Sequence, residues 1–347
     1  MYIKLTRYST YNLDIFFDKD DKLLDKIKII VFSGNHASTN ILIQNRKIQI
    51  EYLPIDVYKL SFIDDEVNFY TSKYNYGLIC YNYSSDKDQI KAKNIDIKDL
   101  LSTNHKIKLG KDNEIIWNFD IDNLISLRLI YDILGCIPQT NNITRFIREI
   151  GKLVNYNDDY GIISGCWKKN VKLNNNRSLF DVLQILFNTR NNIIYGQCFT
   201  FAAVLCGILR NINIPSRCIT CYNACHDGNI DGDITQKQGN FDRFIDNPDK
   251  NTDDFRWNFH VWVECYIKGK WYAIDSSPVY RNELNECIIG PSCIDNIKNN
   301  NYLDTDNYDV NVFSSTVDNI KHKFNNIYIL TYYKNKLTNI TKNYRNS

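Results

Sequence analysis

The spacing of apolar residues changes once along this chain of 347 residues, and that change limits the folds it can adopt. From Lys26 to about Tyr83, short runs rich in Ile, Val, Tyr and Phe follow one another with turn residues between them, a pattern typical of β-strands. After about residue 96 the apolar residues recur at helical spacing over longer segments. We therefore expect an α+β protein with a small β-sandwich over residues 1–95 and a second domain over residues 96–347.

Three segments of the second domain are predicted to form amphipathic helices. They span residues 120–134, 141–154 and 177–187, and in each the apolar residues return every three or four positions. At the start of the third segment, Ser178 and Asp181 resemble a capping box, in which the serine side chain accepts a hydrogen bond from an amide of the first turn. Each helix therefore has one apolar face available for packing.

A fourth helix is predicted to begin at Cys198, in the stretch YGQCFTF. The apolar residues that follow, from Phe201 to Ile212, share one helical face. Further along, residues 215–223 are predicted to form a strand, and the stretches WNFHVWVECYI and WYAID, which flank the short segment KGK, are predicted to form a β-hairpin. The pattern therefore places a cysteine at a helix N-terminus and a small sheet after that helix.

Composition excludes several classes of partner. Lys and Arg number 42 and Asp and Glu number 40, so the net charge of +2 gives no field for binding nucleic acid. No apolar run approaches the roughly 20 residues that span a bilayer, and the opening MYIKLTRYST does not resemble a secretory signal, so we expect a cytoplasmic protein that binds no membrane. In that compartment the 11 cysteines are expected to be reduced thiols.

Cys198 has a sequence neighbourhood that favours a reactive thiolate. A free thiol has a pKa of about 8.5, and a helix N-terminus together with an adjacent imidazolium lowers the pKa to roughly 3–4. His260 lies in a strongly apolar strand, where an unpaired ring would cost stability, so it needs a partner.

The turn of the hairpin decides whether Asp275 is that partner. A two-residue turn at Lys268–Gly269, or a four-residue turn at 267–270, places Trp262 opposite Asp275 and brings the carboxylate diagonally beside His260. The neighbouring register would turn Asp275 to the other face of the sheet. The sequence thus permits a triad of Cys198, His260 and Asp275, in which the thiol attacks, the imidazole transfers the proton and the carboxylate holds the ring. The alternative is a buried structural histidine.

Two stretches are rich in oxygen ligands. In HDGNIDGDI the side-chain oxygens alternate with glycines that permit tight turns, an arrangement that suits a hard cation such as Ca²⁺, whereas a solvated polar loop is the alternative. In VNYNDDYG a second set could bind another ion, although the stretch by itself favours a turn. The candidate ligands are Asp227, Asn229, Asp231 and Asp233 in the first stretch and Asn155, Asn157, Asp158 and Asp159 in the second.

A zinc site is a weaker alternative for the cysteines near residue 220. Cys218, Cys221 and Cys225 lie beside His226, which are residue types that bind zinc. However, Cys218 and Cys221 are three residues apart in a predicted strand and would therefore face opposite sides.

The stretches YGQCFTFAAVLCGILRNINIPSRCITCYNACHD, RWNFHVWVE and WYAIDSSP together closely resemble the catalytic core of animal-type, calcium-dependent transglutaminases, the protein-glutamine γ-glutamyltransferases. Upstream, IIWNF and LVNYNDDYGIISGCW match in the same order, so the resemblance covers roughly residues 115–300. It implies a papain-like α+β core in which Cys198 attacks the side-chain carboxamide of a protein-bound glutamine. Ammonia leaves, a thioester forms, and a lysine or another primary amine converts it to an isopeptide bond; water in place of the amine gives deamidation.

The resemblance also assigns roles to further residues. It implies that the indole N–H of Trp167 and the backbone N–H of Cys198 bind the oxyanion, and that Trp257 and Trp167 form the walls of the channel for the amine. Phe199 stands where animal enzymes commonly have tryptophan, a departure that should leave the chemistry intact. The implied cofactor is Ca²⁺, held at one site by Asp227, Asn229, Asp231, Asp233 and Asp254 and at another by Asn155, Asn157 and Asp159.

Animal transglutaminases continue into two C-terminal β-barrels, whereas this sequence ends at Ser347, so the resemblance leads us to expect a core without those barrels and without control by GTP. A hydrolase of the same superfamily, such as a thiol protease, a deamidase or a peptide N-glycanase-like enzyme, would use the same triad. The paired tryptophans and the calcium loop favour the transferase over that alternative. A non-enzymatic scaffold is disfavoured, because the nucleophile, the histidine and the aspartate are retained together.

Overall fold

The computed structural model describes most of the chain up to residue 277, and beyond it only the backbone of three strands. Within residues 221–258 likewise, only strand backbone is described. The residues outside the description are 19, 36, 89–96, 110–112, 138–139, 141, 156–160, 167–175, 189–193, 223, 227–233, 240–254, 257–258, 278–311, 315–326, 334–335 and 344–347.

The N-terminal part of the chain is built from strands, as the short apolar runs predict. Five of its strands lie in one sheet in the order β1-β8-β6-β3-β4, with β7 paired to β6, while β2 and β5 form a separate ladder. The bounds are β1 Tyr2–Thr6, β2 Ser9–Asn12, η1 Leu13–Ile15, α1 Asp21–Lys26, β3 Ile27–Ser33, β4 Ser38–Leu42, β5 Lys47–Ile50, β6 Val57–Asp64, β7 Phe69–Tyr70 and β8 Tyr76–Cys80.

Sequence reasoning missed the elements that precede Lys26. Strand β1 pairs in parallel with β8, from Tyr2 opposite Tyr76 to Thr6 opposite Cys80, so its partner lies far away in the sequence. Helix α1 is short and is capped by Asp20, whose side chain accepts the amide hydrogens of Lys22 and Leu23. The predicted domain boundary near residue 95 falls within residues 89–96, outside the described part, and stays a prediction.

The four predicted helices of the second part are present as α2 Leu124–Leu134, α3 Ile143–Val154, α4 Leu179–Asn188 and α5 Cys198–Asn211. Asn123 and Asn142 cap α2 and α3, because each side chain accepts two amide hydrogens of the first turn. At α4, Ser178 Oγ accepts the Asp181 amide at 3.3 Å, as the predicted capping box requires. The stronger cap comes from Asp120, whose Oδ2 accepts the Phe180 amide at 2.8 Å and the Ser178 hydroxyl at 2.7 Å.

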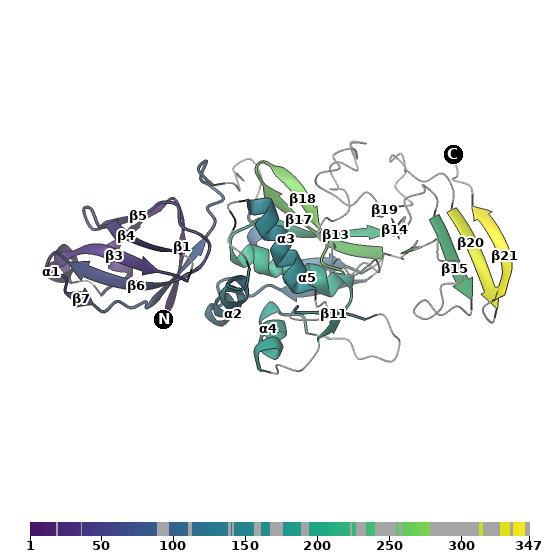
Figure 1. Cartoon of the computed structure of the whole chain (residues 1–347), viewed down its shortest axis with the longest axis horizontal. Coiled ribbons are helices and arrows are strands. Elements are labelled where there is room, and N and C mark those ends of the chain that lie inside the picture. The colour runs from purple at the N-terminus through teal and green to yellow at the C-terminus, as the bar shows by residue number, and fades with distance from the viewer. Residues whose placement is uncertain are drawn as a thin grey trace.

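A three-stranded antiparallel sheet, β13-β17-β18, lies against α5. Helix α5 is buried along its whole length, and alternate residues of β17 from Val261 to Ile267 are buried in the same core cluster. Figure 1 shows the N-terminal strands at one end of the molecule, the helices and this sheet in the middle, and β15, β20 and β21 at the other end. The remaining bounds are η2 Asp99–Leu101, β9 Asn104–Lys108, β10 Glu114–Asn118, β11 Ser164–Gly165, β12 Tyr195–Gly196, β13 Ser216–Tyr222, β14 Ala224–His226, β15 Ile234–Gly239, β16 Phe255–Arg256, β17 Phe259–Ile267, β18 Lys270–Ile274, β19 Val312–Ser314, β20 Ile327–Tyr333 and β21 Lys336–Asn343.

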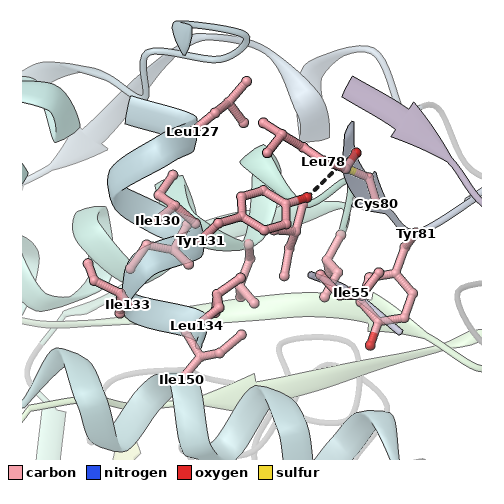
Figure 2. Packing of buried hydrophobic residues seen from close by; sticks show 14 of the residues in the cluster. Ile55, Leu78, Cys80, Tyr81, Leu127, Ile130, Tyr131, Ile133, Leu134 and Ile150 are labelled. Atoms are coloured by element: carbon pink, nitrogen blue, oxygen red, sulfur yellow. Dashed lines mark hydrogen bonds between the residues drawn. The ribbon is translucent and has the colours of Figure 1, made fainter. Parts of the chain in front are cut away.

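The N-terminal sheet and the helices share one hydrophobic core, which anchors the far end of α5. Tyr131 of α2 reaches across to β8, where its hydroxyl donates to the Ile79 carbonyl oxygen at 2.8 Å and contacts the Cys80 sulfur at 3.0 Å (Figure 2). The Tyr81 amide donates to the Ile212 carbonyl oxygen, directly after α5 ends. Within the described residues, no helix is both long and apolar enough to cross a membrane.

Candidate active site

Cys198 is the first residue of α5, as the sequence predicts, and the backbone just before it is closely packed against its neighbours. Gln197 occupies the N-cap in an extended conformation, and its side chain forms no capping hydrogen bond. Gly196 belongs to β12, which runs parallel to β11, and its carbonyl oxygen accepts the Cys166 amide at 3.0 Å. A Cβ at position 196 would lie 2.8 Å from a methyl of Ile163 and 2.9 Å from Cβ of Thr200, so only glycine fits there. The sequence YGQC therefore combines a strand end, a close contact and a helix start.

The hairpin that carries the other two residues has the register that brings them together. Lys268 and Gly269 both have positive φ angles, 52° and 80°, as a two-residue type I′ turn requires. Ile267 accordingly pairs with Lys270, and the ladder continues to Val263 opposite Ile274. This confirms the predicted two-residue turn and its register.

His260 and Asp275 form a buried pair at the open end of this hairpin. Nε2 of His260 is hydrogen-bonded to Oδ2 of Asp275, and Oδ1 of Asp275 accepts the Ser277 amide at 2.8 Å. The exposed fractions of His260 and Asp275 are only 4% and 7%, so water does not screen their interaction. The carboxylate is thus fixed by one amide and one imidazole.

The electrostatics of His260 favour its charged form. Burial alone would lower the pKa of the imidazole. The charge and hydrogen bond of Asp275, together with the smaller contributions of Cys198, outweigh burial, so the pKa of His260 is raised to about 10. At neutral pH these interactions favour the imidazolium form of the ring.

The three residues of the predicted triad come from α5, from β17 and from the chain just after β18, and two of them, His260 and Asp275, are joined directly. Because Asp275 occupies Nε2, Nδ1 is the ring nitrogen that remains for Cys198. An imidazolium and a helix N-terminus both stabilise a thiolate. The arrangement can therefore supply a nucleophile together with a proton donor and acceptor.

Two further residues support this pair, of which sequence reasoning overlooked Ser277. Trp262, two positions after His260, is 2% exposed and packs against the imidazole with ring centroids 6.2 Å apart. His260 and Trp262 share a face of the strand, as the two-residue alternation predicts. Ser277 supplies the amide that holds Asp275, and the Asp-Ser-Ser sequence is a signal for such a local side-chain turn.

Most of the other predicted site residues lie outside the described part of the chain and stay predictions. They are Trp167, Trp257, Asp227, Asn229, Asp231, Asp233, Asp254, Asn157, Asp158 and Asp159. Of the alternative zinc ligands, only Cys218 has a described side chain. Within the described residues, no group of three or more His, Cys, Asp or Glu side chains is arranged to hold a metal ion.

Asn155 is the one predicted calcium ligand that lies in the described part. It follows α3, its amide donates to the Lys152 carbonyl oxygen at 3.0 Å, and it forms a bridge with Ile163. Its side chain is buried, and Oδ1 has no hydrogen-bond partner among the described residues. A buried amide oxygen without a partner costs free energy, and oxygen is the atom that Ca²⁺ binds. Asn155 therefore fits the role of a cation ligand.

Comparison with known proteins gives the site its context. Residues 148–276 match the family described as Transglutaminase-like superfamily. The chain is 31% identical over 164 residues to protein-glutamine gamma-glutamyltransferase 5 of Homo sapiens, and the aligned segment covers 44% of this chain and 22% of that protein. It is 34% identical over 164 residues to protein-glutamine gamma-glutamyltransferase 2 of Homo sapiens, and the aligned segment covers 44% of this chain and 23% of that protein. Annulin of Schistocerca americana is 30% identical over 174 residues, and the aligned segment covers 44% of this chain and 22% of annulin.

The fold agrees with these matches. The crystal structure of red sea bream transglutaminase aligns with 95% of this chain and 56% of its own, with a TM-score of 0.67 at 18% identity. The curated relatives above are matched over less than a quarter of their own length. Cys198, His260 and Asp275 all lie within the matched segment. Residues 148–276 are therefore similar to a transglutaminase-like core, and the fold of the chain is the α+β fold of the transglutaminase structure.

Proposed function

We propose that this protein is a calcium-dependent protein-glutamine γ-glutamyltransferase that forms isopeptide bonds through a thioester on Cys198. The observation that carries this proposal is the buried His260–Asp275 pair, whose histidine lies on the strand that packs against the helix beginning at Cys198. Two of the relatives named above are protein-glutamine gamma-glutamyltransferases, which supports glutamine as the acyl donor.

In the proposed first half-reaction, the Cys198 thiolate attacks the carboxamide carbon of a glutamine side chain on a protein substrate. The tetrahedral oxyanion is bound by the backbone N–H of Cys198 and by the indole N–H of Trp167, and loss of one such donor typically raises the barrier by about 3–4 kcal/mol. His260 then gives its proton to the leaving nitrogen, ammonia departs and the thioester remains.

In the proposed second half-reaction, a primary amine attacks the thioester and His260 accepts its proton. The sulfur leaves as the thiolate, and the acyl group is joined to the amine by an isopeptide bond. Asp275 holds the ring in one orientation and stabilises its charged form in both halves. Trp167 and Trp257 are assigned the walls of the amine channel, where aromatic side chains exclude water and so favour transfer over hydrolysis.

Calcium is proposed to bind the two loops that carry the oxygen-rich stretches. Asn155, Asn157 and Asp159 would hold one ion, and Asp227, Asn229, Asp231, Asp233 and Asp254 would hold another. A bound ion would neutralise the carboxylates of each loop and fix the loop against the core. The buried Oδ1 of Asn155, which has no partner among the described residues, supports the first of these sites.

The test is amine incorporation by the purified chain. The protein is incubated with a glutamine-bearing protein and a biotinylated primary amine, with calcium or with a chelator. We expect incorporation that requires calcium, that is lost in Cys198→Ser and His260→Asn, and that persists in Cys136→Ser, a matched change at an exposed cysteine. Incorporation that persists in Cys198→Ser would refute the assignment of the nucleophile.

The same assay separates the transferase from a hydrolase of this superfamily. A hydrolase would convert glutamine to glutamate, or would cleave the substrate, even when the amine is abundant. Free acid as the only product in the presence of amine would therefore contradict the proposed transferase and support the hydrolase.

A further inference from the structure

Strand β4 forms one edge of the six-stranded N-terminal sheet. It pairs with β3 on one side, and within the described residues no strand pairs with it on the other side. Figure 1 shows β4 away from α2 and α5 and from the sheet that carries the candidate active site. An edge strand presents unpaired backbone N–H and C=O groups, which can pair with a strand of another chain.

Two hydrogen bonds at the ends of β4 determine which of its backbone groups face this open edge. Before the strand, the Gly34 amide donates to the Ala37 carbonyl oxygen at 2.8 Å. After it, the Ile43 amide donates to the Lys28 carbonyl oxygen at 2.7 Å. In an antiparallel ladder, residue pairs that exchange hydrogen bonds alternate with pairs that do not. Every second residue from Ala37 to Ile43 therefore bonds to β3.

This alternation assigns Thr39 and Ile41 to the bonded pairs with β3. The N–H and C=O groups of Ser38, Asn40 and Leu42 consequently point away from β3, toward the open edge. No hydrogen bond joins these groups to another of the described residues. The whole length of β4 is thus available to pair with a further strand.

Strand β4 lacks the features that usually protect an edge. From Ala37 to Gln44 the sequence has no charged residue and no proline, and the ladder with β3 has no bulge. Natural edge strands are usually protected by a charge, a proline or a bulge. The opposite edge strand, β1, carries Lys4, which forms an ion pair with Asp122 at 3.0 Å. Only one of these two edges is therefore protected by a charge.

An apolar row on one face of the sheet reaches the open edge. Leu42 of β4 pairs with Ile29 of β3. Ile29 pairs in turn with Ile63 of β6, and Ile63 pairs with Phe69 of β7. Directly paired residues share a face of the sheet, and the two ends of this row, Leu42 and Phe69, are 65% and 70% exposed. A strand added to β4 would therefore cover apolar surface at Leu42 as well as pair the backbone.

We propose that two copies of this chain associate by antiparallel pairing of β4 with β4, across a twofold axis at Asn40. In this register Asn40 lies opposite Asn40 of the second copy, and Ser38 lies opposite Leu42 of the second copy. The three residues with outward-facing backbone groups in each strand then exchange hydrogen bonds with the other copy. The same five-residue strand supplies both sides of the interface, as a twofold axis requires.

The charge pattern favours a second copy as the occupant of this edge. A twofold axis places each residue of β4 opposite itself or another residue of the same strand. A charged residue at the axis would therefore meet a like charge, which destabilises a pair of strands. Strand β4 contains no charge that would oppose this pairing.

The dimer is expected to be weak and to leave the candidate active sites uncovered. Pairing of two short strands buries little area, and small interfaces form transient complexes. Cys198 begins α5, which lies away from β4 in Figure 1, so one dimer would present two candidate active sites. The inference does not depend on the proposed transferase activity.

The experiment is analytical ultracentrifugation of the full chain over a wide range of loading concentrations. We expect the mass of wild-type protein to rise with concentration from one chain toward two. Asn40→Lys should weaken the association by about tenfold, because it places two like charges opposite each other at the axis. Asn40 is exposed, and the matched control Gln184→Lys adds the same charge at an exposed position of α4 and should associate like wild type.

A mixture of two variants tests the register. Asn40→Lys and Asn40→Glu should each associate weakly alone, and their equimolar mixture should regain a dimer because opposite charges then meet at the axis. Wild-type protein that stays a monomer at every concentration would overturn the proposal. So would an Asn40→Lys dimer as stable as that of wild type, or a mixture that associates no better than either variant.

Hydrogen exchange of the wild-type amides decides the question if a variant fails to fold. We expect the amides of Asn40 and Leu42 to exchange quickly in dilute protein and slowly in concentrated protein. The amides of Thr39 and Ile41, which bond to β3, should exchange slowly at both concentrations. Exchange at Asn40 and Leu42 that does not change with concentration would contradict pairing through β4.

Discussion

Replacing Asp275 by asparagine tests the electrostatics of the candidate site most directly. The change keeps the shape of the side chain but removes the charge that faces Nε2 of His260. Each pKa unit corresponds to about 1.4 kcal/mol, so raising the pKa of His260 from the ordinary 6.5 to about 10 corresponds to an interaction on the order of 5 kcal/mol. Without the carboxylate, burial dominates and we expect the pKa of His260 to fall below 6.5.

The free energy of unfolding should depend on pH in the direction that the raised pKa of His260 dictates. A histidine whose pKa is raised on folding contributes stability that is complete below pH 6.5 and is lost as the pH rises through about 10. Wild-type protein should therefore exceed Asp275→Asn in its free energy of unfolding by several kcal/mol at neutral pH, with the gap closing toward pH 10. Urea denaturation at a series of pH values measures the gap.

The assay for the histidine itself is an NMR titration of protein with labelled histidine rings, in which His260→Asn assigns the resonance. We expect the wild-type ring to stay protonated through pH 8 and the Asp275→Asn ring to be neutral at pH 7.5. The Cys198 thiol should then react more slowly with iodoacetamide at neutral pH in the variant. A wild-type midpoint near 6.5, or a variant midpoint that stays near 10, would refute the reasoning.

Three further predictions concern single side chains. Gly196→Ala should destabilise the fold by about 1–3 kcal/mol in urea denaturation, because the new Cβ would press on Ile163 and Thr200; an unchanged midpoint would contradict the close approach before Cys198. Tyr131→Phe should cost about 1–2 kcal/mol, because the Ile79 carbonyl loses its donor in a buried place, and thermal unfolding that matches wild type would disprove this. Asn155→Ala should raise the calcium concentration needed for half-maximal thermal stabilisation, and an identical calcium titration would remove Asn155 from the ligand set.

Local features of the fold follow from the sequence because their causes are local. The helix that begins at Cys198 is specified by an apolar run at helical spacing. The turn at Lys268 and Gly269 is specified by a short polar segment with a glycine that accepts positive φ, and that turn fixes the register of Asp275. Strand β1 was missed because its partner β8 lies far along the chain, and a parallel pairing leaves no turn signal in the sequence next to the strand.

The sequence by itself thus determined which residue begins the helix and, through the two-residue turn, which face of the hairpin carries His260 and Asp275. Only the tertiary structure decided that the sheet lies against α5, so that the strand carrying His260 packs against the helix that begins with Cys198. The physical reason is that apolar burial has no direction: periodicity identifies the face that must be covered, whereas the partner that covers it is chosen by how the whole core packs.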